Sequence, residues 1–114
     1  MSTSPLTPIV IAKNLTTAWK DIYTVPDTAD RVGIDAVVFN NYSALTTSFS
    51  VRIVQTGLSS ELTEIITEKE IRKFRNDLAP AMIGQSIKKG GAIQVKASAN
   101  DSINANITAT VISI

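Results

Sequence analysis

The residue types that most often do chemistry in proteins are scarce in this chain. It has no cysteine and no histidine, which removes thiolate nucleophiles, thiolate metal ligands and the commonest general base. Ten acidic residues remain, and a pair such as Asp21 and Asp35 would suit glycoside hydrolysis if the fold brought them together. A solvated surface explains them more simply. We therefore predict that the protein is not an enzyme and has no cofactor and no catalytic or metal site.

Two aromatic residues form the second candidate site. Trp19 and Tyr23 are spaced to share one face of a strand, where their rings could stack on a sugar. The competing interpretation is that a single tryptophan in a small domain packs into the core. These two residues carry the alternative hypothesis of a carbohydrate- or receptor-binding module.

A basic cluster in the middle of the chain is the third candidate. Lysines and arginines surround an aromatic residue in "EKEIRKFRND", a pattern seen in nucleic-acid binding. Acidic neighbours dilute this cluster, and the whole chain has 11 basic against 10 acidic residues. We therefore predict no nucleic-acid partner and interpret the cluster as a solvated strand or as an ion-pair network between subunits, in which Arg72, Phe74 and Arg75 would contact another subunit.

The elements that would position these residues follow a two-residue hydrophobic rhythm. Apolar side chains alternate with polar ones around Ile9, over 18–25, over 32–38 and 49–53, and again from Ile93 and from Ala105 to Val111. This alternation predicts that Ala36 and Val38 continue the inward face of Ile34, and that Val95 and Ile107 point into the core. Turn residues separate these stretches, and the 32–38 and 49–53 strands are expected to form a hairpin. About eight short strands predict an all-β fold, an antiparallel β-sandwich of jelly-roll type.

Two segments interrupt the rhythm. The stretch 61–78 fits either a helix or two strands, and we favour strands at 62–67 and 70–75 because its apolar residues occupy opposite sides of a helical wheel. One short helical turn is expected near 79–85, between Pro80 and Gly84. The sequence "KKGG" at 88–91 is interpreted as a hairpin turn rather than an anion-binding loop.

The two ends of the chain are expected to make contacts. Residues 1–8 contain two prolines and predict an extended N-terminal arm, followed by one β-sandwich domain over 9–114. We predict that Pro5, Leu6 and Pro8 contact a neighbouring copy. The last residues, Ile112 and Ile114, are apolar and are expected to meet a second layer or another subunit. No signal peptide and no membrane-spanning run is apparent, so no membrane contact is expected.

Several short motifs resemble a pattern found in small virion structural proteins of tailed bacteriophages. In the C-terminal half these are the turn at 80–84, the corner at 88–93, the strand "VKAS" at 95–98 and the ending "VISI" at 111–114. In the front half, "YTVP" at 23–26 and the stretch "DRVGIDAVVFNNYSALTTSFSVRIV" are similar. The resemblance covers about ninety residues, and its motifs are structural rather than catalytic.

That resemblance implies a non-enzymatic β-sandwich that joins other virion proteins on a head, neck, tail or baseplate, for example as a capsid decoration protein. It implies localisation in the virion, assembled in the cytoplasm of a bacterial host. We expect a homo-oligomer, with a trimer preferred. The alternative is the carbohydrate- or receptor-binding module of a phage fibre or tail tip, using Trp19 and Tyr23.

Overall fold

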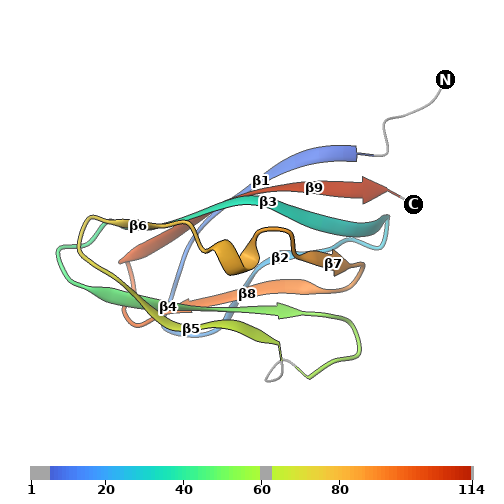
Figure 1. The fold of residues 1–114 in the computed structure, drawn as a ribbon. Coiled ribbons are helices and arrows are strands. Elements are labelled where there is room, and N and C mark those ends of the chain that lie inside the picture. Colours follow the sequence, from blue (N-terminus) through green and yellow to red (C-terminus); the bar gives the residue numbers. More distant parts are fainter. Residues whose placement is uncertain (1–5, 60–62, 114) are drawn as a thin grey trace.

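The fold is a sandwich of two antiparallel β-sheets, seen in a computed structural model that describes residues 6–59 and 63–113. Figure 1 shows the sheets packed face to face, with β1, β9 and β3 side by side in one layer and β8, β4 and β5 in the other. The nine strands are β1 (Leu6–Asn14), β2 (Lys20–Thr24), β3 (Ala29–Asn41), β4 (Thr47–Val54), β5 (Glu64–Ile71), β6 (Asn76–Asp77), β7 (Ser86–Lys88), β8 (Ala92–Ala97) and β9 (Ile103–Ser113). The predicted all-β sandwich is confirmed.

The strand order is that of a jelly roll. One sheet runs β1-β9-β3-β6, with β7 also paired to β3, and the other runs β2-β8-β4-β5. Successive strands mostly alternate between the sheets, and among the described strands only β4 and β5 are both consecutive and paired. The hairpin expected between 32–38 and 49–53 is therefore wrong, since β3 and β4 lie in different sheets. The "KKGG" corner likewise crosses between sheets instead of closing a hairpin.

The core lies between the sheets and contains the residues that the alternation places inward. Val95 and Ile107 are completely buried, as are Val32 and Val51. At the centre, the rings of Phe39 and Phe49 stack with centroids 4.3 Å apart, which joins β3 to β4 across the two layers.

A β-bulge changes the inward face of β3. The register with β9 shifts between Ile34 and Ala36, so the side-chain alternation reverses there. Val37 and Phe39 are buried, whereas Ala36 is exposed. The expectation that Ala36 and Val38 continue the inward face of Ile34 is wrong, because a strict period of two cannot anticipate an extra residue.

The segment after residue 59 is a strand, as we favoured over a helix, but its boundaries differ. One strand, β5, covers Glu64–Ile71, and a turn follows at 72–75 in place of the expected second strand. Residues 60–62 lie outside the described part. The helical turn expected near 79–85 is present as a 3-10 helix, Pro80–Met82, with Gly84 in the left-handed region at φ 85°.

The N-terminal strand begins earlier than the sequence suggests. Residues 6–8 of the expected arm belong to β1, and Leu6 is opposite Ile112 of β9. Residues 1–5 and 114, which include the predicted contacts Pro5 and Ile114, lie outside the described residues. Within the described ranges, no helix is long and apolar enough to cross a membrane.

Candidate interface at the sheet edges

The sandwich has one long, regular open edge, formed by β1. Within residues 6–59 and 63–113 this strand pairs only with β9, and its nine residue pairs run without a register shift. The Leu15 N–H donates to the Ile103 carbonyl on the β9 side at 2.9 Å. Because backbone groups alternate direction along a strand, the odd residues of β1 bond to β9 and the even residues point outward.

Pro8 fits this alternation. As an even residue it sits where the backbone N–H would point away from β9, and proline has none to offer. Beyond it, Val10, Ala12 and Asn14 direct their N–H and C=O groups to the outer edge. No other strand in the described part of the chain pairs with them.

A groove follows this edge, between β1 and the neighbouring strand β2 of the other sheet. It has a volume of about 490 Å³ and is lined by Ile9, Val10, Ile11, Ala12, Lys13, Ile22 and Tyr23. Val10 is 74% exposed, and burial raises the pKa of the Tyr23 phenol. The edge therefore combines unpaired backbone groups with an apolar hollow and a single charged residue, Lys13.

The opposite edge of the sandwich is irregular. In the sheet that contains β1, this edge consists of two short strands, β6 and β7, instead of one continuous strand. On the other side, β5 has a bulge where Thr67 and Glu68 face the single residue Ser50 of β4. Glu68 takes a left-handed φ of 43°, and its N–H donates to the Ser50 Oγ at 2.9 Å. Bulges and charges of this kind hinder the addition of another strand.

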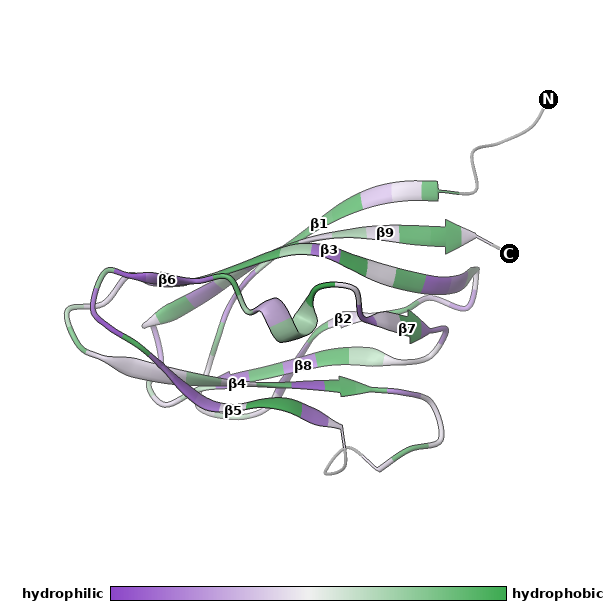
Figure 2. Cartoon of the chain, viewed as in Figure 1, coloured by the Kyte–Doolittle hydropathy of each residue, from purple (hydrophilic) through white to green (hydrophobic). Residues whose placement is uncertain are grey.

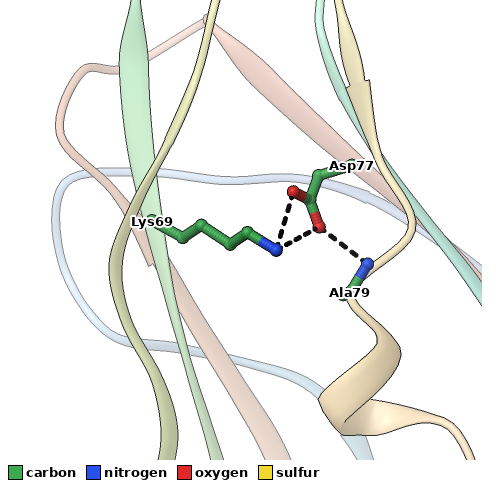
Figure 3. A network of polar contacts seen from close by, with 3 residues as sticks. All are labelled: Lys69, Asp77 and Ala79. Atoms are coloured by element: carbon green, nitrogen blue, oxygen red, sulfur yellow. Dashed lines mark hydrogen bonds and ion pairs between the residues drawn. The ribbon is translucent and has the colours of Figure 1, made fainter.

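An ion pair connects the two sheets at that irregular edge. The Lys69 Nζ of β5 lies 3.0 Å and 3.3 Å from the two carboxylate oxygens of Asp77 in β6. Asp77 also accepts a 2.7 Å hydrogen bond from the Ala79 N–H, as Figure 3 shows. Ala79 is buried with φ 42°, so Asp77 holds the backbone at the entry to the 3-10 turn.

The predicted contact residues Arg72, Phe74 and Arg75 lie together in the turn after β5. The Arg75 N–H donates to the Arg72 carbonyl at 3.1 Å, and Phe74 is 66% exposed. A hollow of about 320 Å³ lies beside them and is lined by Arg72, Arg75 and acidic neighbours including Asp77. Their contact with a partner stays a prediction, as does that of Leu6, Pro8 and Ile112 along the β1–β9 pair.

The two aromatic candidates have different neighbours. Trp19 is half-buried, with the Arg52 guanidinium 3.8 Å and the Lys96 ammonium 4.9 Å from its ring centroid. Tyr23 lines the groove beside β1. Trp19 is therefore outside the buried core, and the cations over its ring compete with a stacking ligand.

Asp21 and Asp35 are not paired with each other. Asp21 accepts a hydrogen bond from Gln94 in one sheet, and Asp35 accepts one from Thr110 in the other. The residues described here contain no cluster of three or more metal-ligating side chains. A further hollow of about 200 Å³ lies on the outer face of the β8-β4 sheet and is lined by residues such as Ser50, Glu68 and Lys96.

Comparison with known proteins bears on the fold. No protein-family model matches the chain, and no curated protein matches its sequence. Among solved structures, a chain of the disulfide-linked pili of Bacillus endospore appendages matches with a TM-score of 0.57 at 8% identity. That match covers 96% of this chain and 87% of the pilus chain.

Capsid chains of a virus also match, over part of their length. A chain of the infectious bursal disease virus (IBDV) particle gives a TM-score of 0.47 at 7% identity, covering 98% of this chain and 32% of that one. The VP2 subviral particle of the same virus gives 0.44 at 10% identity, covering 95% and 32%. The chain thus spans about a third of these viral proteins, and of these matches the pilus chain alone supports a shared fold.

Proposed function

We propose that this protein is a non-enzymatic structural subunit that assembles with copies of itself through its sheet edges. The observation that carries the proposal is the open edge of β1, with outward backbone groups at Val10, Ala12 and Asn14 above an apolar groove. Strand addition at such an edge gains affinity from main-chain hydrogen bonds and specificity from alternate side chains.

The likeness to a pilus subunit supports this proposal, since that protein forms a polymer from a sandwich of the same kind. The pili are described as disulfide-linked, whereas the present chain has no cysteine. Its copies must therefore be held together by non-covalent contacts, which increases the importance of edge pairing and apolar burial.

The particle that we propose is the virion of a tailed bacteriophage, with the protein as a capsid decoration, neck or tail accessory subunit. The motifs at 80–84 and 88–93 support this assignment, because in the structure they form the 3-10 turn and the corner that enters β8. The trimer expected from the sequence would need a contact between two different surfaces of each copy, separate from any two-fold contact at one edge. The sugar-binding alternative gains no support, because Trp19 and Tyr23 do not face one ligand site.

Light scattering of the purified protein tests self-association. We expect a species several times heavier than the 12.2 kDa chain, and a mass that stays monomeric at every concentration would contradict the proposal. The assignment to a virion is tested by mass spectrometry of particles purified from the phage whose genome encodes the chain. We expect the protein in them at a fixed ratio to the major capsid protein, and its absence would contradict that assignment.

A further inference from the structure

We propose that β1 pairs antiparallel with β1 of a second copy, around a two-fold axis that passes beside Ala12. This inference rests on the proposed self-assembly and specifies its contact. It begins from the outward positions of β1 that follow Pro8, which are Val10, Ala12 and Asn14. A strand added to this part of the edge would hydrogen-bond to those residues.

Elimination favours β1 itself as the added strand. On the irregular edge of a second copy, β6 and β7 have only two and three residues, and β5 is bulged and carries several carboxylates. Beside β1, the edge strand of the other sheet is β2, which has five residues and a register shift between Asp21 and Tyr23. Among the edge strands within the described ranges, β1 is the one with a long run free of shifts and of acidic residues.

The position of Pro8 sets the register. In antiparallel pairing of β1 with its copy, a register that places Ala12 opposite Ala12 also places Val10 opposite Asn14. All six outward N–H groups that follow Pro8 in the two strands then find a carbonyl partner, two hydrogen bonds for each directly opposed pair. Pro8 falls beyond the paired stretch, whereas shifting the strands by two or four residues toward it would place its ring against a partner strand.

The same register closes the groove. Ile9 and Ile11 point inward on the groove side of β1, and the Ile11 side chains of the two copies would be diagonal neighbours across the two-fold axis. Lys13 is the only charged residue of β1 and would lie opposite Ile11 of the second copy. The contact therefore joins two apolar hollows without opposing a charge directly to its twin. A two-fold contact of this kind also leaves the far edge of each copy free for a different contact in a larger particle.

Single cysteines provide the test, because the natural chain has none. In the proposed register, the Ala12 positions of the two copies lie ~5.5 Å apart, whereas the Val10 positions are offset by four residues, or ~14 Å. A thiol reagent that spans no more than ~8 Å, between these two distances, is added to each variant. We expect Ala12→Cys to yield covalent dimers and Val10→Cys, which is also at an exposed position, to yield at least roughly tenfold fewer.

The β1 pairing would be overturned if both variants cross-linked equally. It would also be overturned if neither cross-linked in a protein that light scattering shows to be assembled. Either result would leave the proposed function standing. A monomeric protein would overturn both. A second pair of variants guards against a folding artefact. Ala12→Pro removes an outward N–H without touching the bonds to β9 and should abolish the contact in a folded chain, whereas Ala12→Ser should preserve it. Unchanged association of a folded Ala12→Pro variant would contradict the proposal.

Discussion

The two open edges of this sandwich differ in nearly every property that controls strand addition. The β1 edge has nine residue pairs in unbroken register and one charge. The far edge has a bulge at Glu68, two short strands, and an ion pair between Lys69 and Asp77 that links the sheets. Figure 2 shows the contrast, with hydrophilic stretches along β5 and β6 and hydrophobic ones at β1. The far edge is therefore protected against the addition of another strand, whereas the β1 edge is open to it.

The largest expected loss of stability comes from a substitution at the centre of a sheet rather than at its open edge. Ile107→Asp should unfold the domain, at a cost of more than ~4 kcal/mol, because an unpaired charge would enter the completely buried position beside Ile11. Denaturant titration followed by circular dichroism measures this loss. A normal unfolding midpoint for Ile107→Asp would contradict the core described here.

The next effect concerns the ion pair of the far edge. Asp77→Ala should destabilise the fold by about 1–3 kcal/mol, because the Ala79 N–H loses its acceptor in a buried turn. Asp77→Asn is the matched control, since it keeps an acceptor and loses only the ion pair to a partly exposed lysine, at a cost below ~1 kcal/mol. Thermal melting of the two variants measures both, and equal losses would show that Asp77 acts through charge alone.

The bulge of β5 predicts a smaller effect. Glu68→Val should cost about 1–2 kcal/mol, because a β-branched residue fits poorly at its φ of 43°. Glu68→Gly should cost nothing measurable in the same denaturant titration, since glycine adopts this conformation freely. If both variants were equally stable, the strain assigned to this edge would be absent.

The smallest effect on stability is expected at the open edge, where association should change instead. Val10→Asp should leave the free energy of unfolding within about 0.5 kcal/mol of the original, because the side chain is 74% exposed. The same change should weaken self-association at least roughly tenfold, or about 1.4 kcal/mol, by placing a carboxylate at the contact. Thr67→Asp, an exposed site on β5, is the control and should change neither quantity in analytical ultracentrifugation.

Much of the fold could be predicted from the sequence, and the failures share a physical cause. Alternation identifies which side chains are buried, so Val95 and Ile107 were placed correctly. It carries no information on which strand is the neighbour, so the alternation of β3 and β4 between sheets was missed. A bulge adds a residue without any compositional signal, which explains the wrong side predicted for Ala36.

The candidate interface was harder to predict, because an edge exists only once the strand order is known. The sequence directed attention to Trp19 and to the cluster around Phe74, both rich in distinctive side chains. The outward positions Ala12 and Asn14 have plain side chains and offer backbone groups instead. Pro8 was the available signal, since a proline within an apolar run indicates an edge strand whose missing N–H faces outward.

The place of β9 has a consequence for biogenesis. Of the strands in the described ranges this one is made last, yet it lies between β1 and β3 and is the strand with which β1 pairs. During translation β1 therefore waits unpaired while nearly a hundred residues are synthesised, and such distant pairing makes folding slow. The surface that we assign to contact between copies is completed only after β9 is inserted, so specific assembly at this edge should follow the synthesis of β9.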